Sequence, residues 1–395
     1  MDKTKNSIKL EGRIDSANAP QWEEKLINAV KEIPENEDLI LDASSLQYIS
    51  SAGLRVLLKL QKSRSRKITV TEVSPEVYDI FETTGFSELL DVKKRLRRID
   101  VNGCECIGEG FYGKVFRIDP DTIVKVYSNE DAVPMIENEK KMAKIAFLKG
   151  IPTAISYDIV RVGESYGSVF ELLNAKNLNE VIIEKEGDPD EISNTVKKYV
   201  EFVKNIHGIE LDPGSVPDAR DIFLGYLDAM REYLEDPLYE SLRSLLKKMP
   251  EDHHVVHGDI QMKNVMITDN ELMLIDMDTL CAGDPVFELA GPYVTYQIFG
   301  EDEPENSLRF LGIKADTAKL IWSKVLDYYF EEKNRKNHEL IMDKIKVAGY
   351  IRFLNIITTS DLKNGELGSL RIRHTLENLN DLAKKVVSLN LRDEG

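Results

Sequence analysis

The chain has 395 residues, more than one typical domain holds, and its 42% hydrophobic and 31% charged residues are an ordinary soluble balance. No apolar run approaches the roughly 20 residues that cross a bilayer, and the start lacks a signal-peptide core, so we expect a cytoplasmic protein without membrane insertion. Three cysteines are too few for a disulfide framework, and we expect buried reduced thiols.

The net charge of −17 lies entirely beyond the first hundred residues. Residues 1–100 carry 17 basic and 17 acidic side chains, so the remainder holds the whole acidic excess. Such a surface disfavours nucleic acid and suits a cationic or neutral substrate. The same charge can serve solubility alone, and the sequence leaves these two interpretations open.

Short strands and helices alternate over the first hundred residues. We expect strands in SIKLEGRI, DLILDAS and ITVTEV, and helices over 19–33, 53–63 and 75–84. Trp22, Leu26, Ile27 and Val30 fall on one face of the first of these helices. The alternation predicts a small α/β layer.

A basic stretch, KKRLRR, follows at 93–98. It is interpreted either as a nucleic-acid patch or as a final strand or linker, and the lack of aromatic residues favours the second. Beyond it we expect strands in CECIGEGFYGKVFRI, in TIVKVY and near 157–163 and 167–173, with a helix over 134–148. From about residue 177 the sequence predicts mostly helices.

Three glycines, Gly108, Gly110 and Gly113, form a G-x-G-x-x-G pattern, and Val115 completes the longer version found in kinases. Glycine is needed where backbone passes close over phosphates, because a Cβ would hold the chain off. Predicted strands on both sides favour a kinase loop over a dinucleotide fingerprint, which would open into a helix. A tight glycine hairpin without a ligand is the alternative.

Lys125 lies between two valines in TIVKVY, twelve residues after the last of these glycines. A lysine on a buried strand needs a partner, and in kinases it contacts the α- and β-phosphates and pairs with a glutamate on the next helix. Glu139 and Glu137 are the candidates. We predict Glu139, because it stands one turn before apolar Met142, and we expect Glu137 to be a solvated surface charge.

The segment VVHGDIQMKNVMI has the spacing of a kinase catalytic loop. Asp259 would lie near the attacking hydroxyl and Asn264 would hold magnesium. We expect His257 to hold the loop rather than to react. Asp276 ends the apolar strand of LMLIDMD, where a carboxylate can bind the metal that bridges the β- and γ-phosphates. Asp278 either assists it or belongs to the turn.

Residues 104–395 resemble the aminoglycoside phosphotransferase and choline kinase superfamily. HGD replaces the His-Arg-Asp of protein kinases, IDMD replaces Asp-Phe-Gly, and CAGDPVFELA matches the family's G-D-P-x-x-(D/E)-L-A stretch. In that stretch we expect Asp284 to cap a helix. The resemblance implies an α+β kinase-like fold of two lobes, with a small antiparallel sheet in an N-lobe at 104–174 and a mainly helical C-lobe at 175–395.

The resemblance also implies ATP and Mg²⁺ as cofactors and a role for each residue of the pattern. Lys125, paired with Glu139, would place the phosphates, and Asp259 would orient or deprotonate a substrate hydroxyl. Asn264 and Asp276 would hold magnesium. Adenine would lie against the connection between the lobes, where backbone groups of Glu171, Leu172 and Leu173 make the contacts.

Two departures from the family pattern affect the choice of acceptor. Gln261 stands where histidine is common, and Lys263 stands where glycine is frequent. They remove no catalytic group but prevent the transfer of a specific substrate. The acceptor hydroxyl can belong to a small alcohol, such as an amino sugar, a choline-like compound or a nucleoside, or to a protein serine.

The segment DASSLQYISSAGLRVLLKL resembles the central motif of STAS domains of the anti-sigma factor antagonist class, and the resemblance covers residues 7–98. In that family the serine before (S/A)-G is phosphorylated, which maps to Ser51. A helix N-terminus stabilises a phosphate through its free N–H groups and its dipole. Ser50 stands where the family often has aspartate, and the alternative is that Ser50 or Ser51 only caps the helix.

We therefore expect a STAS domain at 1–98, a linker at 99–103 and a kinase-like domain at 104–395 in a bacterial protein. The kinase-like domain would transfer the ATP γ-phosphate to an alcohol, and the STAS domain would regulate it or bind a protein partner. A competing hypothesis is a non-catalytic ATP sensor that acts through the STAS domain. An aminoglycoside resistance kinase ranks third, because such an enzyme has no evident need of a STAS domain.

Overall fold

A computed structural model describes residues 6–31, 33–110, 113–129, 132–268, 271–330 and 337–392. Its contacts divide the chain into two units. The first comprises Met1–Asp100 with Ile159–Glu164, and the second comprises Val101–Asp158 with Ser165–Gly395. Each unit has its own cluster of buried hydrophobic side chains.

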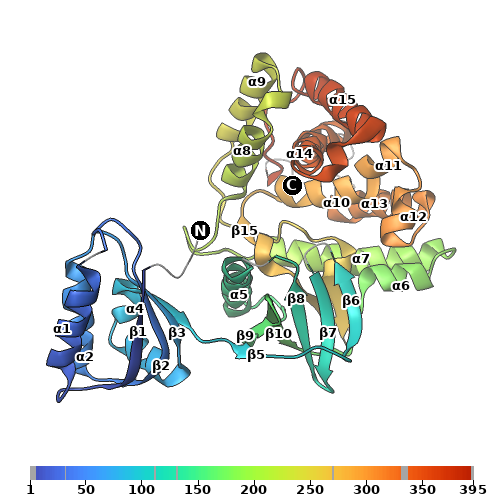
Figure 1. Cartoon of the computed structure of the whole chain (residues 1–395). Helices are drawn as coiled ribbons and strands as arrows, with labels where there is room; N and C mark the ends of the chain where they lie inside the picture. The colour runs from blue at the N-terminus through green and yellow to red at the C-terminus, as the bar shows by residue number, and fades with distance from the viewer. Residues whose placement is uncertain are drawn as a thin grey trace. The chain divides into compact units, whose positions relative to one another are not determined.

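The first unit contains a four-stranded parallel sheet in the order β1-β2-β3-β4 (Figure 1). Its strands are β1 (Ser7–Ile14), β2 (Ile40–Ile49), β3 (Thr69–Val73) and β4 (Asp91–Lys94). Its helices are α1 (Ala19–Val30), α2 (Ser51–Lys62), α3 (Pro75–Thr83) and α4 (Phe86–Leu89). Parallel neighbours need crossover connections, which these helices supply, so the predicted α/β layer is confirmed.

Two helix boundaries differ from the expected ones for local reasons. α1 ends at Val30 instead of Ile33, and Pro34 disfavours helical backbone at Ile33. α2 begins at Ser51 instead of Gly53, because the Ser50 side chain caps it one residue earlier.

A second sheet has the order β5-β9-β10-β8-β7-β6. Its strands are β5 (Arg97–Arg98), β6 (Glu105–Gly110), β7 (Gly113–Asp119), β8 (Thr122–Tyr127), β9 (Asp158–Val162) and β10 (Ser165–Glu171). The pairs β6–β7, β7–β8 and β8–β10 are antiparallel, as predicted. β5, which precedes the predicted N-lobe at 104–174, pairs with β9 in parallel.

The basic stretch at 93–98 supplies backbone to two sheets: it includes the end of β4 and all of β5. Cys281 is buried, as expected, but Cys104 is half-buried and Cys106 is exposed. The expected burial is wrong for Cys106, because β6 is the outermost strand of its sheet.

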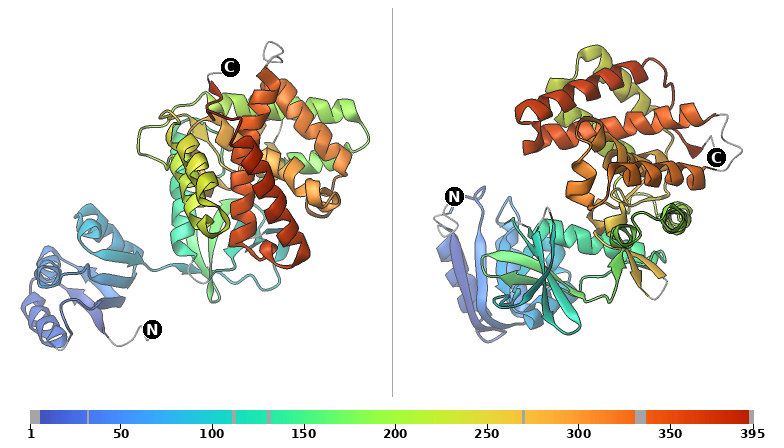
Figure 2. Two further views of the ribbon diagram at one scale, coloured as in Figure 1. Left: turned by 90° about the horizontal axis from the view of Figure 1, so that it is seen from above. Right: turned by 90° about the vertical axis from the view of Figure 1, so that its right-hand side faces the viewer.

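The rest of the second unit is mainly helical, as predicted (Figure 2). After α5 (Val133–Leu148) in the N-lobe, its helices are α6 (Leu178–Glu184), α7 (Pro189–His207), α8 (Ala219–Ala229), α9 (Asp236–Lys247), α10 (Pro285–Tyr293), α11 (Phe299–Asp302), α12 (Asn306–Leu311), α13 (Ala315–Tyr329), α14 (His338–Thr359) and α15 (Gly365–Leu382). α14 packs against both α10 and α15 (Figure 1). Asp284 caps α10 by accepting the Val286 N–H at 2.8 Å, as predicted.

Short strands hold the loops that carry the predicted site. These strands are β11 (Lys176–Asn177), β12 (Val255–Val256), β13 (Val265–Thr268), β14 (Glu271–Leu274) and β15 (Cys281–Ala282). Val265 pairs with Leu274 across the β13–β14 hairpin, and the Ile275 N–H donates to the Asn264 carbonyl at 3.0 Å. This register brings Asn264 beside Asp276.

Candidate active site

The glycine-rich segment joins β6 to β7, with Gly110 paired with Gly113. Gly113 has no room for a side chain, because a Cβ there would lie 1.9 Å from the carbonyl oxygen of Val126 on β8. At Gly108 a Cβ would lie at an ordinary 3.7 Å from Val115. The strands on both sides exclude a loop that opens into a helix, as a dinucleotide fingerprint requires.

Lys125 lies on β8, inside the sheet, with β7 and β10 as neighbours. Its Nζ lies 3.4 Å and 3.5 Å from the two carboxylate oxygens of Glu139 on α5. Glu139 is 6% exposed, whereas Glu137 is exposed. The structure therefore contains the ion pair that the sequence predicted, with the predicted glutamate.

The Lys125 ammonium has a second anionic partner, because it also donates to Asp276 Oδ1. Burial would lower the pKa of Lys125, but the negative charges of Asp276 and Glu139 outweigh it, so the pKa is raised and the ammonium stays charged. Burial and the same two carboxylates raise the pKa of Asp278 to about 6. Asp278 lies in a 3-10 turn (Met277–Thr279) directly after Asp276.

The Asp259 carboxylate lies at the centre of the HGD loop and accepts from three side chains. Its Oδ2 accepts from Gln261 Nε2 at 3.1 Å and from Asn264 Nδ2 at 2.9 Å. Its Oδ1 accepts from Arg352 Nη2 at 3.1 Å, and Arg352 also donates to the Gly258 carbonyl. These hydrogen bonds fix the orientation of the Asp259 carboxylate.

Glu288 of α10 binds the backbone that precedes Asp259, and its side chain is fully buried. Its carboxylate accepts the N–H groups of His257 at 2.5 Å and Gly258 at 3.1 Å. His257 Nδ1 accepts the Asp259 N–H at 3.2 Å, and Nε2 donates to the Ile275 carbonyl at 3.1 Å. These contacts match the loop-holding role expected for His257.

Gly258 is required in this loop by two constraints. Its φ is +85°, a left-handed conformation that favours glycine. A Cβ there would also lie 2.6 Å from the Thr279 carbonyl oxygen. The middle residue of HGD is therefore dictated by close packing of the two loops.

Oxygen atoms of Asn264 and Asp276 suit a magnesium ion. Within the described residues, both side-chain hydrogen bonds of Asn264 use Nδ2, so its Oδ1 accepts none. Asp276 has a φ of +59°, uncommon for a non-glycine residue, and 43% of its side chain is exposed. The described residues contain no group of three His, Cys, Asp or Glu that could hold a metal ion. Mg²⁺ usually takes only one or two carboxylates and completes its shell with phosphate and water oxygens.

The predicted adenine contacts lie where β10 leads into the C-lobe. Glu171 is the last residue of β10, and Leu173 lies in the segment between β10 and β11. The Leu172 N–H is used within the protein, because it donates to the Asp121 carbonyl at 2.8 Å. The nucleotide role of Glu171 and Leu173 stays a prediction.

Two residues of the loop network were missed from the sequence. Arg352 stands in the apolar run VAGYIRFLNII of α14, and an isolated arginine in a buried helix is a signal that it needs a polar partner. Glu288 lies in the segment that contains Asp284, but only the fold shows that its carboxylate turns to the HGD backbone.

In the first unit the structure separates the roles of two serines. Ser50 is the N-cap of α2, and its hydroxyl accepts the N–H groups of Ala52 at 3.2 Å and Gly53 at 3.5 Å. Ser51 is the first helical residue and its side chain is exposed. The capping alternative is therefore assigned to Ser50, which leaves Ser51 accessible.

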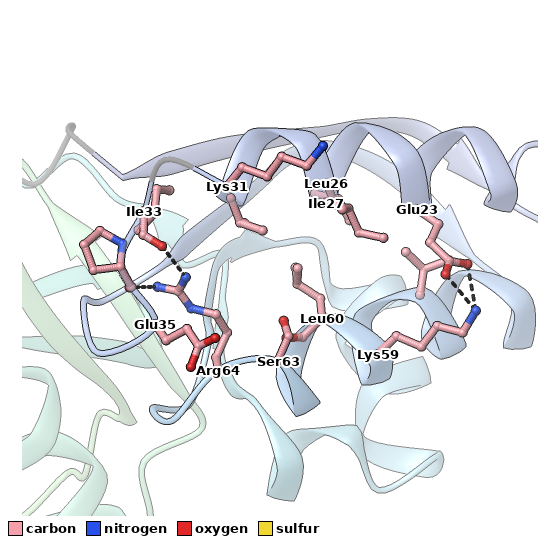
Figure 3. A pocket seen from close by; sticks show the side chains of 13 residues that line it. Glu23, Leu26, Ile27, Lys31, Ile33, Glu35, Lys59, Leu60, Ser63 and Arg64 are labelled. Atoms are coloured by element: carbon pink, nitrogen blue, oxygen red, sulfur yellow. Dashed lines mark hydrogen bonds and ion pairs between the residues drawn. The ribbon is translucent and has the colours of Figure 1, made fainter.

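A cavity of about 620 Å³ lies between α1 and α2 of the first unit (Figure 3). Apolar side chains such as Leu26 and Leu60 line it, and the Lys59–Glu23 ion pair at 2.7 Å lies at its edge. Arg64 donates to backbone carbonyls after α1. The cavity contains none of the predicted site residues.

Two family models match the chain. One, described as a phosphotransferase enzyme family (APH), matches residues 104–319, more than half of the chain. The other, a STAS domain, matches residues 2–99. The two matches follow each other along the sequence without overlap.

The curated relatives match about a fifth of the chain. One of them is BtrV of Bordetella bronchiseptica, which is described as an anti-sigma factor antagonist. It is 37% identical over 86 residues, which are 21% of this chain and 72% of that protein. An anti-sigma-B factor antagonist of Listeria monocytogenes is 31% identical over 85 residues, 21% of this chain and 73% of that protein.

Solved structures of aminoglycoside phosphotransferases resemble most of the chain. APH(2'')-Ib with ADP has 15% sequence identity and a TM-score of 0.47, and the match covers 79% of this chain and 98% of that one. A thermostable APH(4)-Ia variant with AMP-PNP and hygromycin B has 14% identity and a TM-score of 0.48, and the match covers 72% of this chain and 94% of that one.

None of the helices in the described part of this chain has the length and apolar character to cross a bilayer.

The Arg352 contacts predict a loss of turnover in the Arg352→Lys variant. Lysine keeps the charge but has no planar fork to reach both Gly258 and Asp259, and losing a hydrogen bond to a charged group costs about 1.5–3 kcal/mol. We expect the rate of ATP hydrolysis without an acceptor to fall roughly 10- to 100-fold. A lysine variant that hydrolyses ATP at the wild-type rate would contradict this account.

The capping geometry predicts that replacing Ser50 destabilises α2 and that replacing Ser51 does not. Ser50→Ala should lower the free energy of unfolding of the first unit by about 1 kcal/mol, because two helix N–H groups lose their acceptor. Ser51→Ala should change it by less than roughly 0.5 kcal/mol. Hydrogen exchange of the α2 amides in the full chain measures both, and equal effects would refute the assignment of the cap.

Proposed function

The chain belongs to the phosphotransferase enzyme family and carries a STAS domain, and from this premise we propose that it moves the γ-phosphate of ATP to a hydroxyl group. The observation that carries the proposal is the continuous chain of contacts between the predicted residues. Lys125 contacts Asp276. Ile275, the residue before Asp276, donates its N–H to the Asn264 carbonyl, and the Asn264 side chain donates to Asp259.

In this proposal each residue contributes charge or position. The Lys125 ammonium binds the phosphates of ATP, and Glu139 holds that ammonium from the side of α5. Asp259 receives the acceptor hydroxyl and orients its oxygen toward the γ-phosphorus. Arg352 and Gln261 keep Asp259 in that direction.

The Asn264 Oδ1 and the Asp276 carboxylate would hold Mg²⁺, and their oxygen atoms are the ligand type that this ion prefers. When bound, the ion neutralises negative charge on the phosphates. Because Lys125 now bonds Asp276, the lysine must give up part of this contact when its ammonium turns to the phosphates.

The acceptor is proposed to be an alcohol, either on a small molecule or on a protein serine. Ser51 is a specific candidate, in the same chain or on another copy, because it is exposed at the start of a helix whose N–H groups stabilise a phosphate. The similarity to anti-sigma factor antagonists supports a protein partner for the STAS domain. We propose that phosphorylation adds charge to that binding surface.

The Asp259→Asn variant tests the proposal. Asparagine keeps the size of the side chain but loses its negative charge, so transfer should fall at least about 100-fold. The pure full-length chain is incubated with labelled ATP, Mg²⁺ and a metabolite extract, and mass spectrometry locates the label on small molecules or on Ser51. Asp228→Asn, which alters an exposed aspartate that accepts a hydrogen bond from Tyr239, is the matched control.

Two results would contradict the proposal, and a third would identify its acceptor. Label that still reaches Ser51 in pure Asp259→Asn protein would have another source. Magnesium-dependent ATP binding by the wild type without transfer to any alcohol, aminoglycosides included, or to protein would favour the non-catalytic ATP sensor. Label on an aminoglycoside, with raised tolerance on expression, would favour the resistance kinase.

A further inference from the structure

Tyr127 contributes a hydroxyl group to the buried side of the Lys125 site. It stands two residues after Lys125 on β8, so both side chains leave the same face of the sheet. Its hydroxyl donates to Glu139 Oε2 at 2.5 Å, and the residue is 2% exposed. The Lys125 Nζ lies 5.3 Å from the centre of its ring.

Glu139 depends on this hydroxyl for its tightest bond. The two distances from the Lys125 Nζ to its carboxylate oxygens, 3.4 Å and 3.5 Å, are longer than the bond from Tyr127. A carboxylate that is 6% exposed has almost no water to replace a lost donor. Tyr127 is therefore the contact that fixes the direction of the Glu139 carboxylate.

The hydroxyl remains a donor over the working pH range. Burial, together with the charge of Glu139, raises the pKa of Tyr127, so the phenol keeps its proton. The backbone of Tyr127 is also held in the sheet, where it pairs with Gly113 of β7. The tyrosine thus connects the end of the glycine hairpin to α5.

The arrangement also sets a competition for the lysine. Glu139 and Asp276 both attract the Lys125 ammonium, and Asp276 is already bonded to it. A Glu139 that can turn away loses its share of the lysine. Lys125 would then stay on Asp276, which keeps both groups from ATP and its metal ion.

We propose that Tyr127 is a positioning residue for nucleotide binding, which acts through Glu139 to hold Lys125 where the phosphates bind. This inference rests on the proposed role of Lys125. It adds the donor that makes the Lys125–Glu139 pair effective and predicts that the two residues act as one unit.

The test is the dissociation constant of Mg·ADP, measured by calorimetry on the full chain. Tyr127→Phe keeps the ring and removes the hydroxyl, and we expect binding to weaken roughly 5- to 30-fold. Glu139→Gln should weaken it by a similar factor. The double variant should bind no worse than the weaker single variant, because both changes break one link. Wild-type affinity in Tyr127→Phe, or losses that multiply in the double variant, would overturn the inference.

A matched control separates positioning from general stability. Tyr350 on α14 is also buried and donates to a carboxylate, Glu301, at 2.9 Å. Tyr350→Phe should lower the melting temperature while leaving the affinity for Mg·ADP unchanged. If Tyr127→Phe does not fold, Glu139→Gln alone decides, and its wild-type affinity would overturn the inference. A wild-type chain that binds no nucleotide would refute the proposed function itself.

Discussion

The half-buried ammonium of Lys125 is the constraint on which the candidate site depends. An ammonium inside a sheet is stable only with anionic partners, and the chain supplies two, Glu139 from α5 and Asp276 from the end of β14. α5 brings Glu139 to the ammonium, and the Tyr127 hydroxyl bonds that carboxylate. The turn after β14 brings Asp276 to the same ammonium. The Lys125 ammonium on β8 thus contacts a helix and a loop from distant parts of the sequence.

A second set of bonds holds the HGD loop, and it differs in kind. Glu288 accepts backbone N–H groups of the loop, so its contacts do not depend on the side chains of the loop residues. Arg352 acts on the Asp259 side chain directly. Asn264 joins the two sets, because its side chain reaches Asp259 while its carbonyl accepts the N–H of Ile275, the residue before Asp276.

The residues near one another in the sequence could be predicted, and those brought in by folding could not. The glycine pattern, Lys125 and the HGD loop have spacings that backbone geometry requires, so the alternation of strands and the lysine–glutamate pair followed from them. The cap at Asp284 was predicted from the resemblance to the phosphotransferase family. Arg352 lies 93 residues from Asp259, and its contact depends on the packing of α14 against α10. The parallel pairing of β5 was also missed from the sequence, because a two-residue strand carries no periodic pattern.

The central claim is that Lys125 is the phosphate-binding residue of a magnesium-dependent nucleotide site. Its most direct test is the affinity for Mg·ATP of the full-length wild type and of Lys125→Met, which keeps the apolar stem and removes the charge. Calorimetry should show binding to the wild type that needs Mg²⁺ and a loss of at least about 100-fold in the variant. Equal affinities, or binding that ignores magnesium, would contradict the account.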